Sequence, residues 1–277
     1  MARGPGSLTA LLALPAGGYM LLAFAVPLAM LCAASFQGPS GFGFENYLRY
    51  LADPYYRSIV TNSLAIGLGT TLSTLAIAYP AAFAIAARPA WQQTAILAIV
   101  FVPLTVGTIV KSFGWAIALR RNGIVNNMLV GLGIVDAPVQ MLFNVWSLAI
   151  GMTNIFLPFM LLPIYSVVRG IDARLYETAE SLGAGALFRF THVALPLTLP
   201  GILAGASLVF SLSTAAYVIP LLLGGDRFVT VPMLIANGFL NTNNRALGAT
   251  MAVILLATTT LVLMLFNRAA RRSRFAR

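Results

Sequence analysis

Charge is what this sequence has least of. Only 9% of its 277 residues are Asp, Glu, Lys or Arg, whereas 59% are hydrophobic and the mean hydropathy is +0.88. A soluble domain carries about 25% charged residues. The shortage of charge therefore excludes an ordinary soluble globular protein and indicates an integral membrane protein.

Cysteine, histidine and nucleotide-binding motifs are scarce or missing as well. Cys32 is the only cysteine, which excludes an internal disulfide and a cysteine-based metal site. No Gly-x-x-x-x-Gly-Lys-Ser/Thr phosphate loop occurs, so we do not expect this chain to hydrolyse ATP. Glu177, Glu180 and His192 could suggest a metal site, but no Glu-x-x-His pairing exists. We therefore expect no catalytic residue, no metal site and no cofactor in this chain.

Acidic residues are the rarer kind of charge. The chain has 7 Asp and Glu against 17 Lys and Arg, a net charge of +10. In a soluble chain this balance would suggest nucleic acid, but here the basic residues lie mostly between and after apolar runs. That distribution indicates topology signals and contact with anionic lipid, so we expect membrane lipid and no nucleic acid as a partner. An ion-coupled secondary transporter, the main alternative class, would usually carry a carboxylate inside the membrane. All seven acids fall outside the predicted spans.

Long apolar runs are what the sequence has in abundance. A helix needs about 20 apolar residues to cross the core of a bilayer. Six stretches qualify: 9–36, 58–86, 94–119, 141–168, 198–223 and 246–267. The first is longer than the ~7–15-residue apolar region of a signal peptide, so we interpret it as a retained anchor. The sequence predicts an all-α integral membrane protein in which residues 1–277 form a single transmembrane domain of six helices.

An even number of spans places both termini on the same side of the membrane. If that side is the cytoplasm, ten of the 17 Lys and Arg residues face it or flank it, and half of those ten lie from Arg268 to Arg277. Basic residues are enriched on the cytoplasmic side of membrane proteins. We therefore predict cytoplasmic termini and a cytoplasmic loop over residues 169–197.

That loop contains the longest polar interruption of the second half, "YETAESLGAGALFRFTHVALPLTLPG", residues 176–201. Asp172 can cap the start of a helix, and Gly183 can end it in a left-handed conformation. One face of this helix would be apolar and the other polar, formed respectively by Leu175, Ala179 and Leu182 and by Glu177, Glu180 and Ser181. Such a helix could dock in a groove of another protein. The alternative is a helix that lies on lipid. It is disfavoured because Glu177 and Glu180 are acidic and cytoplasmic leaflets are usually anionic.

The identity and spacing of several residues in this loop resemble a motif of a known protein family. Glu177-Thr178-Ala179, Gly183 and Val193-Ala194-Leu195-Pro196 are similar to the EAA loop of permease subunits of binding-protein-dependent ABC importers. Thr178 departs from the central alanine, a change of one small residue for another. "ENYLRYLADPYYRSIVTNSLAIGLG" and "SLVFSLSTAAYVIPLLLGG" are similar to spermidine/putrescine-type permeases, the latter to the first of that system's two permease subunits.

This resemblance implies a type I ABC importer permease fold with a cytoplasmic EAA coupling helix, in a multi-pass protein of a bacterial inner (plasma) membrane. It further implies two ATPase subunits, which bind the ATP and Mg, a second, different permease subunit and an external substrate-binding protein. The residues assigned to ATPase coupling are Glu177, Ala179, Glu180 and Gly183. Glu177 would pair with a basic residue of the ATPase, and Gly183 would allow a sharp turn where a Cβ would clash. For Glu180 a solvated helix face is the open alternative.

The substrate path should use polar residues inside the spans. The candidates are Lys111, Asn154, Ser211, Ser213 and Tyr217. An intramembrane charge such as Lys111 is costly and usually functional, although its side chain could instead reach the outer interface. The other four could join helices by hydrogen bonds. We also expect Pro103, Pro158 and Pro220 to break or bend their helices.

The resemblance favours a polyamine such as spermidine or putrescine as the substrate. A cation would benefit from carboxylates or aromatic faces along its path, yet this chain has no carboxylate in a span and places Lys111 in one. Two accounts follow from this conflict. Either the partner permease carries the acidic lining, or the substrate is another small polar solute, such as an organophosphonate or another anion or zwitterion.

Overall fold

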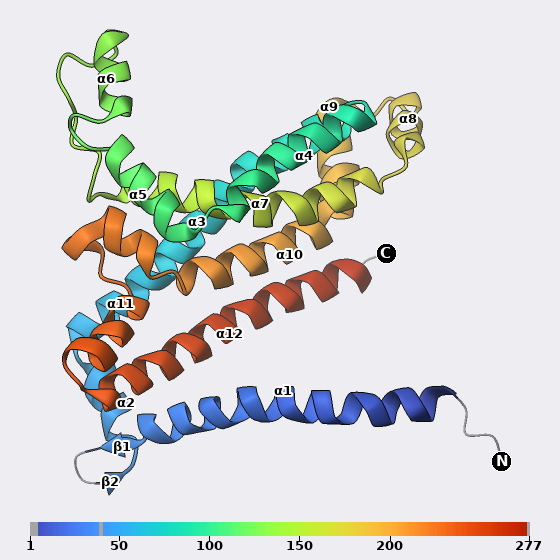
Figure 1. The fold of residues 1–277 in the computed structure, drawn as a ribbon. Coiled ribbons are helices and arrows are strands. Elements are labelled where there is room, and N and C mark those ends of the chain that lie inside the picture. Colours follow the sequence, from blue (N-terminus) through green and yellow to red (C-terminus); the bar gives the residue numbers. More distant parts are fainter. Residues whose placement is uncertain (1–4, 39–40, 276–277) are drawn as a thin grey trace. The chain divides into compact units, whose positions relative to one another are not determined.

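The computed structural model describes residues 5–38 and 41–275, which are mostly helical (Figure 1). The strands described are β1 (Gln37–Gly38) and β2 (Gly41–Phe42), paired antiparallel with Gln37 opposite Phe42. The helices are, in chain order, α1 (Pro5–Ser35), α2 (Glu45–Ala52), α3 (Pro54–Ala86), α4 (Ala90–Thr105), α5 (Thr108–Ala118), α6 (Ile124–Gly131), α7 (Val145–Arg169), α8 (Ala173–Ser181), α9 (Ala186–Arg189), η1 (Phe190–Ala194), α10 (Leu195–Thr214), η2 (Pro220–Gly224), η3 (Gly225–Phe228), α11 (Val231–Ala236), η4 (Asn237–Asn241) and α12 (Arg245–Phe275). The predicted all-α class is confirmed.

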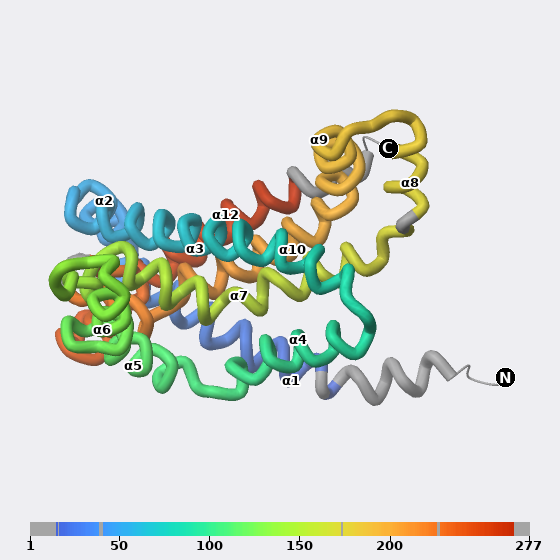
Figure 2. Tube along the Cα trace, turned by 90° about the horizontal axis from the view of Figure 1, so that it is seen from above, coloured from blue at the N-terminus to red at the C-terminus, as the bar shows by residue number. Residues whose placement is uncertain are grey.

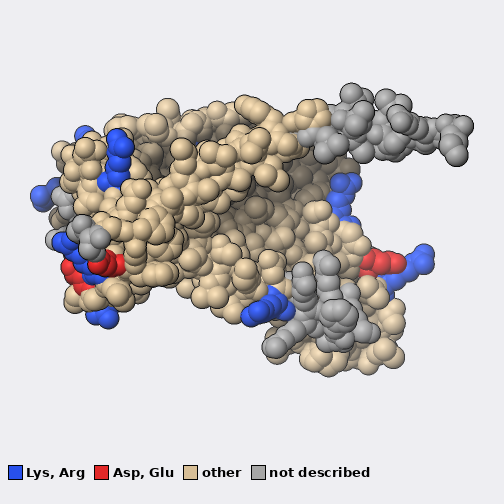
Figure 3. All heavy atoms as spheres, turned by 90° about the horizontal axis from the view of Figure 1, so that it is seen from below, with Lys and Arg blue, Asp and Glu red and all other residues tan. Residues whose placement is uncertain are grey.

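Within the described residues, five helical segments are long and apolar enough to cross a membrane, and a bent pair of helices raises the number to six when it is counted as one span. The five segments are Gly17–Ser35, Pro54–Ala86, Val145–Arg169, Ala186–Thr214 and Arg245–Arg268. On the face drawn in Figure 3, uncharged residues form nearly all of the described surface, and the charged side chains lie in small groups. A surface of this kind suits a lipid environment. The number of apolar spans agrees with the predicted six only when the bent pair is counted as one span.

The bent pair corrects the prediction of one continuous helix over 94–119. The pair consists of α4 and α5, which meet at an angle of 96°. Pro103 lies in the last turn of α4, where it supplies no amide hydrogen to continue the helix. Val106 and Gly107 then adopt extended backbone angles, with ψ of 127° and 142°. The chain therefore changes direction before α5 begins. By contrast, α7 continues through Pro158 and Pro163 as a single helix.

The predicted fifth span, 198–223, also has different ends. The helix α10 stops at Thr214, and residues 220–224 form the separate π-helix η2. At its other end the helix starts earlier than predicted, because α9 and η1 run into α10 without a break. Residues 186–214 therefore form one continuous helical segment.

Contacts divide the chain into two compact units. The first comprises Met1–Arg57 and Leu234–Leu256, and the second comprises Ser58–Met233 and Ala257–Arg277. In the first unit, the buried Asn46 donates hydrogen bonds to the carbonyls of Ser35 and Gln37. Thr250 donates to the same Ser35 carbonyl at 3.2 Å. These bonds connect α1, β1, α2 and the first half of α12.

The core of the second unit is built around α7, against which α10 packs closely. Gly201 and Gly205 lie four residues apart on the α10 face that meets α7. A Cβ on Gly201 would lie 2.8 Å from the carbonyl oxygen of Pro163, and a Cβ on Gly205 would lie 3.1 Å from that of Met160. Small residues at this spacing let two helix backbones approach each other in a membrane. The packing of α7 on α10 therefore depends on the absence of two side chains.

The helix α7 also connects the two ends of the second unit. Figures 1 and 2 both place α8 and α9 at one end of this unit and α5 and α6 at the other. A helix of 25 residues is about 37 Å long, which exceeds the ~30 Å core of a bilayer. The α8–α9 end and the α5–α6 end are therefore far enough apart to lie on opposite sides of a membrane.

Candidate functional site

The motif that contains Glu177 lies on α8, whose two ends are set by local interactions. At the first end, Asp172 Oδ1 accepts a hydrogen bond from the backbone N–H of Arg174 at 2.9 Å and so caps the helix. At the second end, the N–H of Ala184 donates to the carbonyl of Ala179 at 3.0 Å, and the N–H of Gly183 donates to that of Glu180 at 2.9 Å. This pair of bonds is a Schellman motif. Both predicted ends of the helix are confirmed.

Gly183 is required for its backbone conformation and not because space is short. Its φ is +81°, a region that L-residues with a side chain rarely adopt. A Cβ added at this position would meet nothing within 4 Å, so the expected steric clash is wrong. Glycine lets the chain reverse between α8 and α9 without strain.

The structure separates the two carboxylates that were predicted to couple to an ATPase. Arg189 Nη1 donates to Glu180 Oε2 at 2.6 Å, an ion pair that bridges α8 and α9 across the turn. Glu177 is exposed, and within the described part of the chain its carboxylate has no ion pair or hydrogen bond. Glu180 therefore braces the loop internally, whereas Glu177 is available to a partner.

Removal of the Glu180 carboxylate is expected to have a small effect. An exposed ion pair contributes roughly 0–1 kcal/mol, so Glu180→Ala should lower substrate uptake by no more than about fivefold. The reversed pair, Glu180→Arg with Arg189→Glu, should restore the brace and most of the uptake. Uptake normalised to the amount of subunit in the membrane measures both. If Glu180→Ala abolishes uptake and the reversed pair does not recover it, Glu180 contacts a partner directly.

The other side chains of α8 lie in two different environments. Leu175 and Leu182 are 48% and 83% exposed, so part of the predicted apolar face is uncovered. The hydroxyl of Tyr176 is buried, and no described residue hydrogen-bonds to it. Burial raises the pKa of the Tyr176 phenol, and the neighbouring Tyr79 raises it further. The Tyr176 phenol is therefore near enough to Tyr79 of α3 for the two groups to interact electrostatically.

Tyr79 also connects α3 to the helical segment that follows the loop. Its hydroxyl shares a hydrogen bond with Thr198 Oγ1 at 3.1 Å, and its ring meets the edge of the Phe190 ring at a centroid distance of 5.9 Å. Thr198 lies on α10 and Phe190 on η1. Tyr79 thus joins α3 to η1 and to the start of α10.

His192 is held by residues of its own helix. Its ring stacks on that of Phe188 at a centroid distance of 4.0 Å, and Nδ1 shares a hydrogen bond with Thr191 Oγ1 at 2.8 Å. Among residues 5–38 and 41–275, no group of three or more His, Cys, Asp or Glu residues is arranged to hold a metal ion. The geometry around His192 suits a structural histidine.

Three of the five residues predicted for the substrate path make structural hydrogen bonds. Asn154 Oδ1 accepts from Trp115 Nε1 at 3.2 Å, which joins α7 to α5. The buried Ser213 makes a long contact of 3.4 Å with the carbonyl of Gly67 on α3. Ser211 donates to the carbonyl of Ser207 within α10. The bonds of Asn154 and Ser213 join two helices, which is the alternative that the sequence left open, whereas the bond of Ser211 stays within one helix.

Lys111 and Tyr217 are the other two predicted path residues. Lys111 is half-buried on α5, and its ammonium group has no ion pair within the described part of the chain. Tyr217 is 38% exposed in the segment between α10 and η2. A role for either residue in the substrate path stays a prediction.

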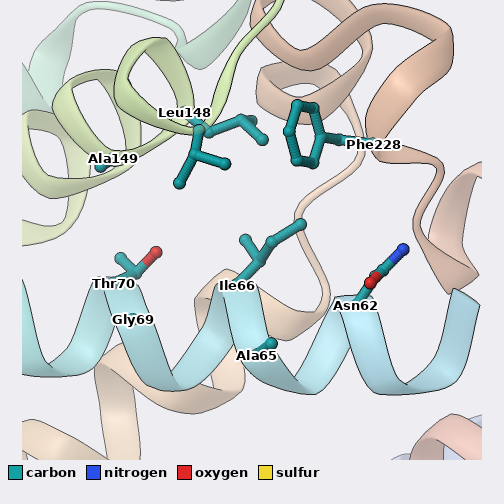
Figure 4. Close-up of a pocket in the computed structure, with 9 residues that line it drawn as sticks. Asn62, Ala65, Ile66, Gly69, Thr70, Leu148, Ala149 and Phe228 are labelled. Carbon is teal, nitrogen blue, oxygen red and sulfur yellow. The ribbon is translucent and has the colours of Figure 1, made fainter. Parts of the chain in front are cut away.

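A cavity of about 210 Å³ opens between α3 and α7, away from all five of these residues (Figure 4). It is lined by Asn62, Ala65, Ile66, Gly69, Thr70, Val145, Leu148, Ala149 and Phe228. Figure 4 shows Asn62 and Thr70 toward opposite ends of the α3 wall, with Leu148 and Phe228 across from Ile66. The amide of Asn62 inside an apolar run was the available signal in the sequence. The signal was missed because a polar residue in a span can join helices by hydrogen bonds as readily as it can line a cavity.

Comparison with known proteins assigns the chain to a protein family. Residues 57–275 match the family described as binding-protein-dependent transport system inner membrane component. The spermidine/putrescine transport system permease protein PotB of Escherichia coli K12 is 34% identical over 230 residues, which cover 83% of each chain. PotB of Haemophilus influenzae is 34% identical over 251 residues, 88% of this chain and 87% of that protein.

A solved structure has the same fold. It is that of a bacterial alginate ABC transporter in complex with an alginate pentasaccharide-bound periplasmic protein, with a TM-score of 0.79, 19% identity and coverage of 96% of this chain and 94% of the other. The predicted type I permease fold is confirmed, and the protein is a multi-pass protein of the inner membrane that serves transport, not catalysis. The chain belongs to the family of binding-protein-dependent transport system inner membrane components, as a permease subunit of an ABC importer.

Proposed function

We propose that this permease subunit moves a polyamine such as spermidine or putrescine across the inner membrane, in an importer driven by ATP. The observation that carries the proposal is the similarity to the PotB proteins, which extends over more than four fifths of the chain. An organophosphonate or another anion is the second candidate, and its support is Lys111 within a bent span.

In this proposal α8 is the helix that couples transport to ATP hydrolysis. Two cytoplasmic ATPase subunits bind ATP and Mg, and one of them receives α8 in a groove. The exposed Leu175 and Leu182 supply apolar contacts, and the free carboxylate of Glu177 pairs with a basic residue of the ATPase. Closure of the ATPase displaces α8, and the displacement passes along the chain through α9 and η1 into α10, which Tyr79 joins to α3. The small side chain of Ala179 keeps the apolar face of α8 slim enough to enter the groove. Gly183 permits the chain to reverse its direction after α8.

The remaining partners follow from the same assignment. A second, different permease subunit completes the pathway, and an external binding protein delivers the substrate. The periplasmic protein bound to the alginate transporter of similar fold supports an external partner of this kind. Both termini and α8 then face the cytoplasm, in agreement with the basic residues at the end of the chain. The α5–α6 end of the second unit faces outward.

The cavity between α3 and α7 is compatible with a polyamine. None of its nine lining residues is charged, so nothing in it repels a cation. Its aliphatic walls suit the methylene segments of a polyamine, and the Phe228 ring offers an aromatic face to an ammonium group. Any acidic lining of the path would come from the second permease subunit.

Replacement of Lys111 separates the two candidate substrates. On a cation path, Lys111→Ala should leave spermidine uptake unchanged or raise it, since an ammonium group in a low-dielectric site repels a cation. Lys111→Arg, which keeps the charge, is the matched control and should behave like the wild type. Uptake is measured in cells without other polyamine transporters, with spermidine and an organophosphonate as competing substrates. Uptake of the organophosphonate without competition from spermidine, and its loss in Lys111→Ala, would refute the polyamine proposal.

A further inference from the structure

The turn between α5 and α6 presents two neighbouring arginines, Arg120 and Arg121. Both are exposed, and among residues 5–38 and 41–275 neither forms an ion pair. Each arginine lines two hollows in the surface, one of about 820 Å³ that extends over Ile117 and Ile124 and one of about 620 Å³ that extends over Met141 and Phe143. The arginine pair, Arg120 and Arg121, therefore stands between two concave surfaces without a carboxylate of its own.

The turn that carries the arginine pair is held in place by hydrogen bonds from a buried side chain. The fully buried Asn126 donates hydrogen bonds from Nδ2 to the carbonyls of Arg120 and Val139, at 3.0 and 2.9 Å. Its Oδ1 accepts from the N–H of Val139 at 2.9 Å. Gly123 fits only without a side chain, because a Cβ would lie 2.6 Å from the carbonyl oxygen of Ile117. A partner would thus meet a turn that is already ordered, which lowers the entropic cost of binding.

The surroundings of the arginine pair have the composition of a protein interface. Ile117, Ile124 and Met128 are about 60% exposed, and Phe143 is 43% exposed. Arginine, methionine and aromatic residues are enriched at protein–protein interfaces, and arginine is frequent among the residues that dominate binding energy. A guanidinium group binds a carboxylate through two parallel hydrogen bonds. Hollows of several hundred Å³ beside the arginine pair suit protruding side chains of a protein more closely than a single phosphate group.

We propose that the arginine pair is the docking point for an acidic patch on the external substrate-binding protein. The proposal rests on the proposed function, which places the α5–α6 end of the second unit on the outer side. Figures 1 and 2 show this end opposite α8, where an external partner can reach it while α8 engages the ATPase. Carboxylates of the binding protein pair with Arg120 and Arg121, and neighbouring apolar side chains enter the two hollows.

The test measures the affinity of the spermidine-loaded binding protein for the complete transporter in nanodiscs. The double charge reversal Arg120→Glu with Arg121→Glu should weaken this affinity at least about tenfold, because like charges then face each other across the interface. Added salt should weaken the binding of the wild type but strengthen that of the double variant, because it screens an attraction in the first and a repulsion in the second. Basal ATPase activity without binding protein should stay unchanged, which shows that the complex is assembled. Arg245→Glu, a charge reversal at another exposed arginine, is the control and should bind as the wild type does.

Each other result has a definite meaning. If the wild-type complex binds the loaded binding protein and the double variant binds it equally well, the docking inference is overturned and the proposed function stands. If the variant instead loses thermal stability only in nanodiscs that contain phosphatidylglycerol, the arginine pair binds lipid headgroups and the inference is again overturned. If the wild-type complex binds no spermidine-loaded protein and imports no spermidine, the proposed function fails and the inference fails with it.

Discussion

A Glu177→Lys subunit is expected to reach the membrane and assemble with its partner permease, yet to import no substrate. The structure leaves the Glu177 carboxylate exposed and unpaired among the described residues, while its neighbour Glu180 is engaged with Arg189. A lysine in that position would face a basic residue of the ATPase, so an attraction would become a repulsion. Like charges placed together at an interface cost several kcal/mol, enough to lower the affinity more than a hundredfold. Docking of α8 should therefore fail while the membrane-spanning part stays intact.

Co-purification of the ATPase with the tagged subunit measures this loss, together with uptake into cells. Glu177→Gln is the matched control, because it removes the charge without reversing it, and it should retain part of the docking. Thr178→Ala changes the adjacent residue to the family's alanine and should behave as the wild type. Full uptake by Glu177→Lys with the ATPase still bound would contradict the coupling role of α8.

A Gly205→Val subunit is expected to be strongly destabilised. The Cβ of a new side chain would lie 3.1 Å from the carbonyl oxygen of Met160 and 2.8 Å from its sulfur, so α10 could not keep its distance from α7. Overpacking of a well-filled core costs typically about 1–3 kcal/mol, and here a backbone atom is among the obstacles. Gly201→Val should act in the same way, because Pro163 and Ile164 present backbone atoms to that position.

The control for Gly205→Val lies one residue away on the same helix. Ala204 is exposed, so Ala204→Val adds the same branched side chain without entering the contact between α7 and α10. Thermal unfolding of the purified complex in detergent should show a clear drop in midpoint for Gly205→Val and none for Ala204→Val. Equal midpoints for the two variants would mean that the close approach of α7 and α10 does not stabilise the protein.

Much of the candidate site was predictable because it depends on short-range interactions. Asp172 caps α8 through the N–H of a residue two positions on. At the other end, Gly183 bonds to the residue three positions back and Ala184 bonds to the residue five positions back. The identities of these residues are enough to indicate such contacts. The function of Glu180 could not be deduced in the same way, since its partner Arg189 is reached only after the chain reverses. The reason given for Gly183 was wrong because free space around a residue is a property of the folded chain.

The sequence by itself determined the membrane class, the set of apolar runs, the helical fold and the position of the α8 motif, because hydropathy and helix capping act over one helix at most. Only the tertiary structure decided where two of the spans break, which path candidates join helices, and which residues enclose the cavity. Asn154 is hydrogen-bonded to Trp115, which is 39 positions away in the sequence, and Ser213 contacts the carbonyl of Gly67, which is 146 positions away. The cavity collects residues from α3, α7 and the segment at Phe228. Such contacts arise from the packing of distant segments, and a polar residue in a span has the same local pattern whether it faces a neighbouring helix or a substrate.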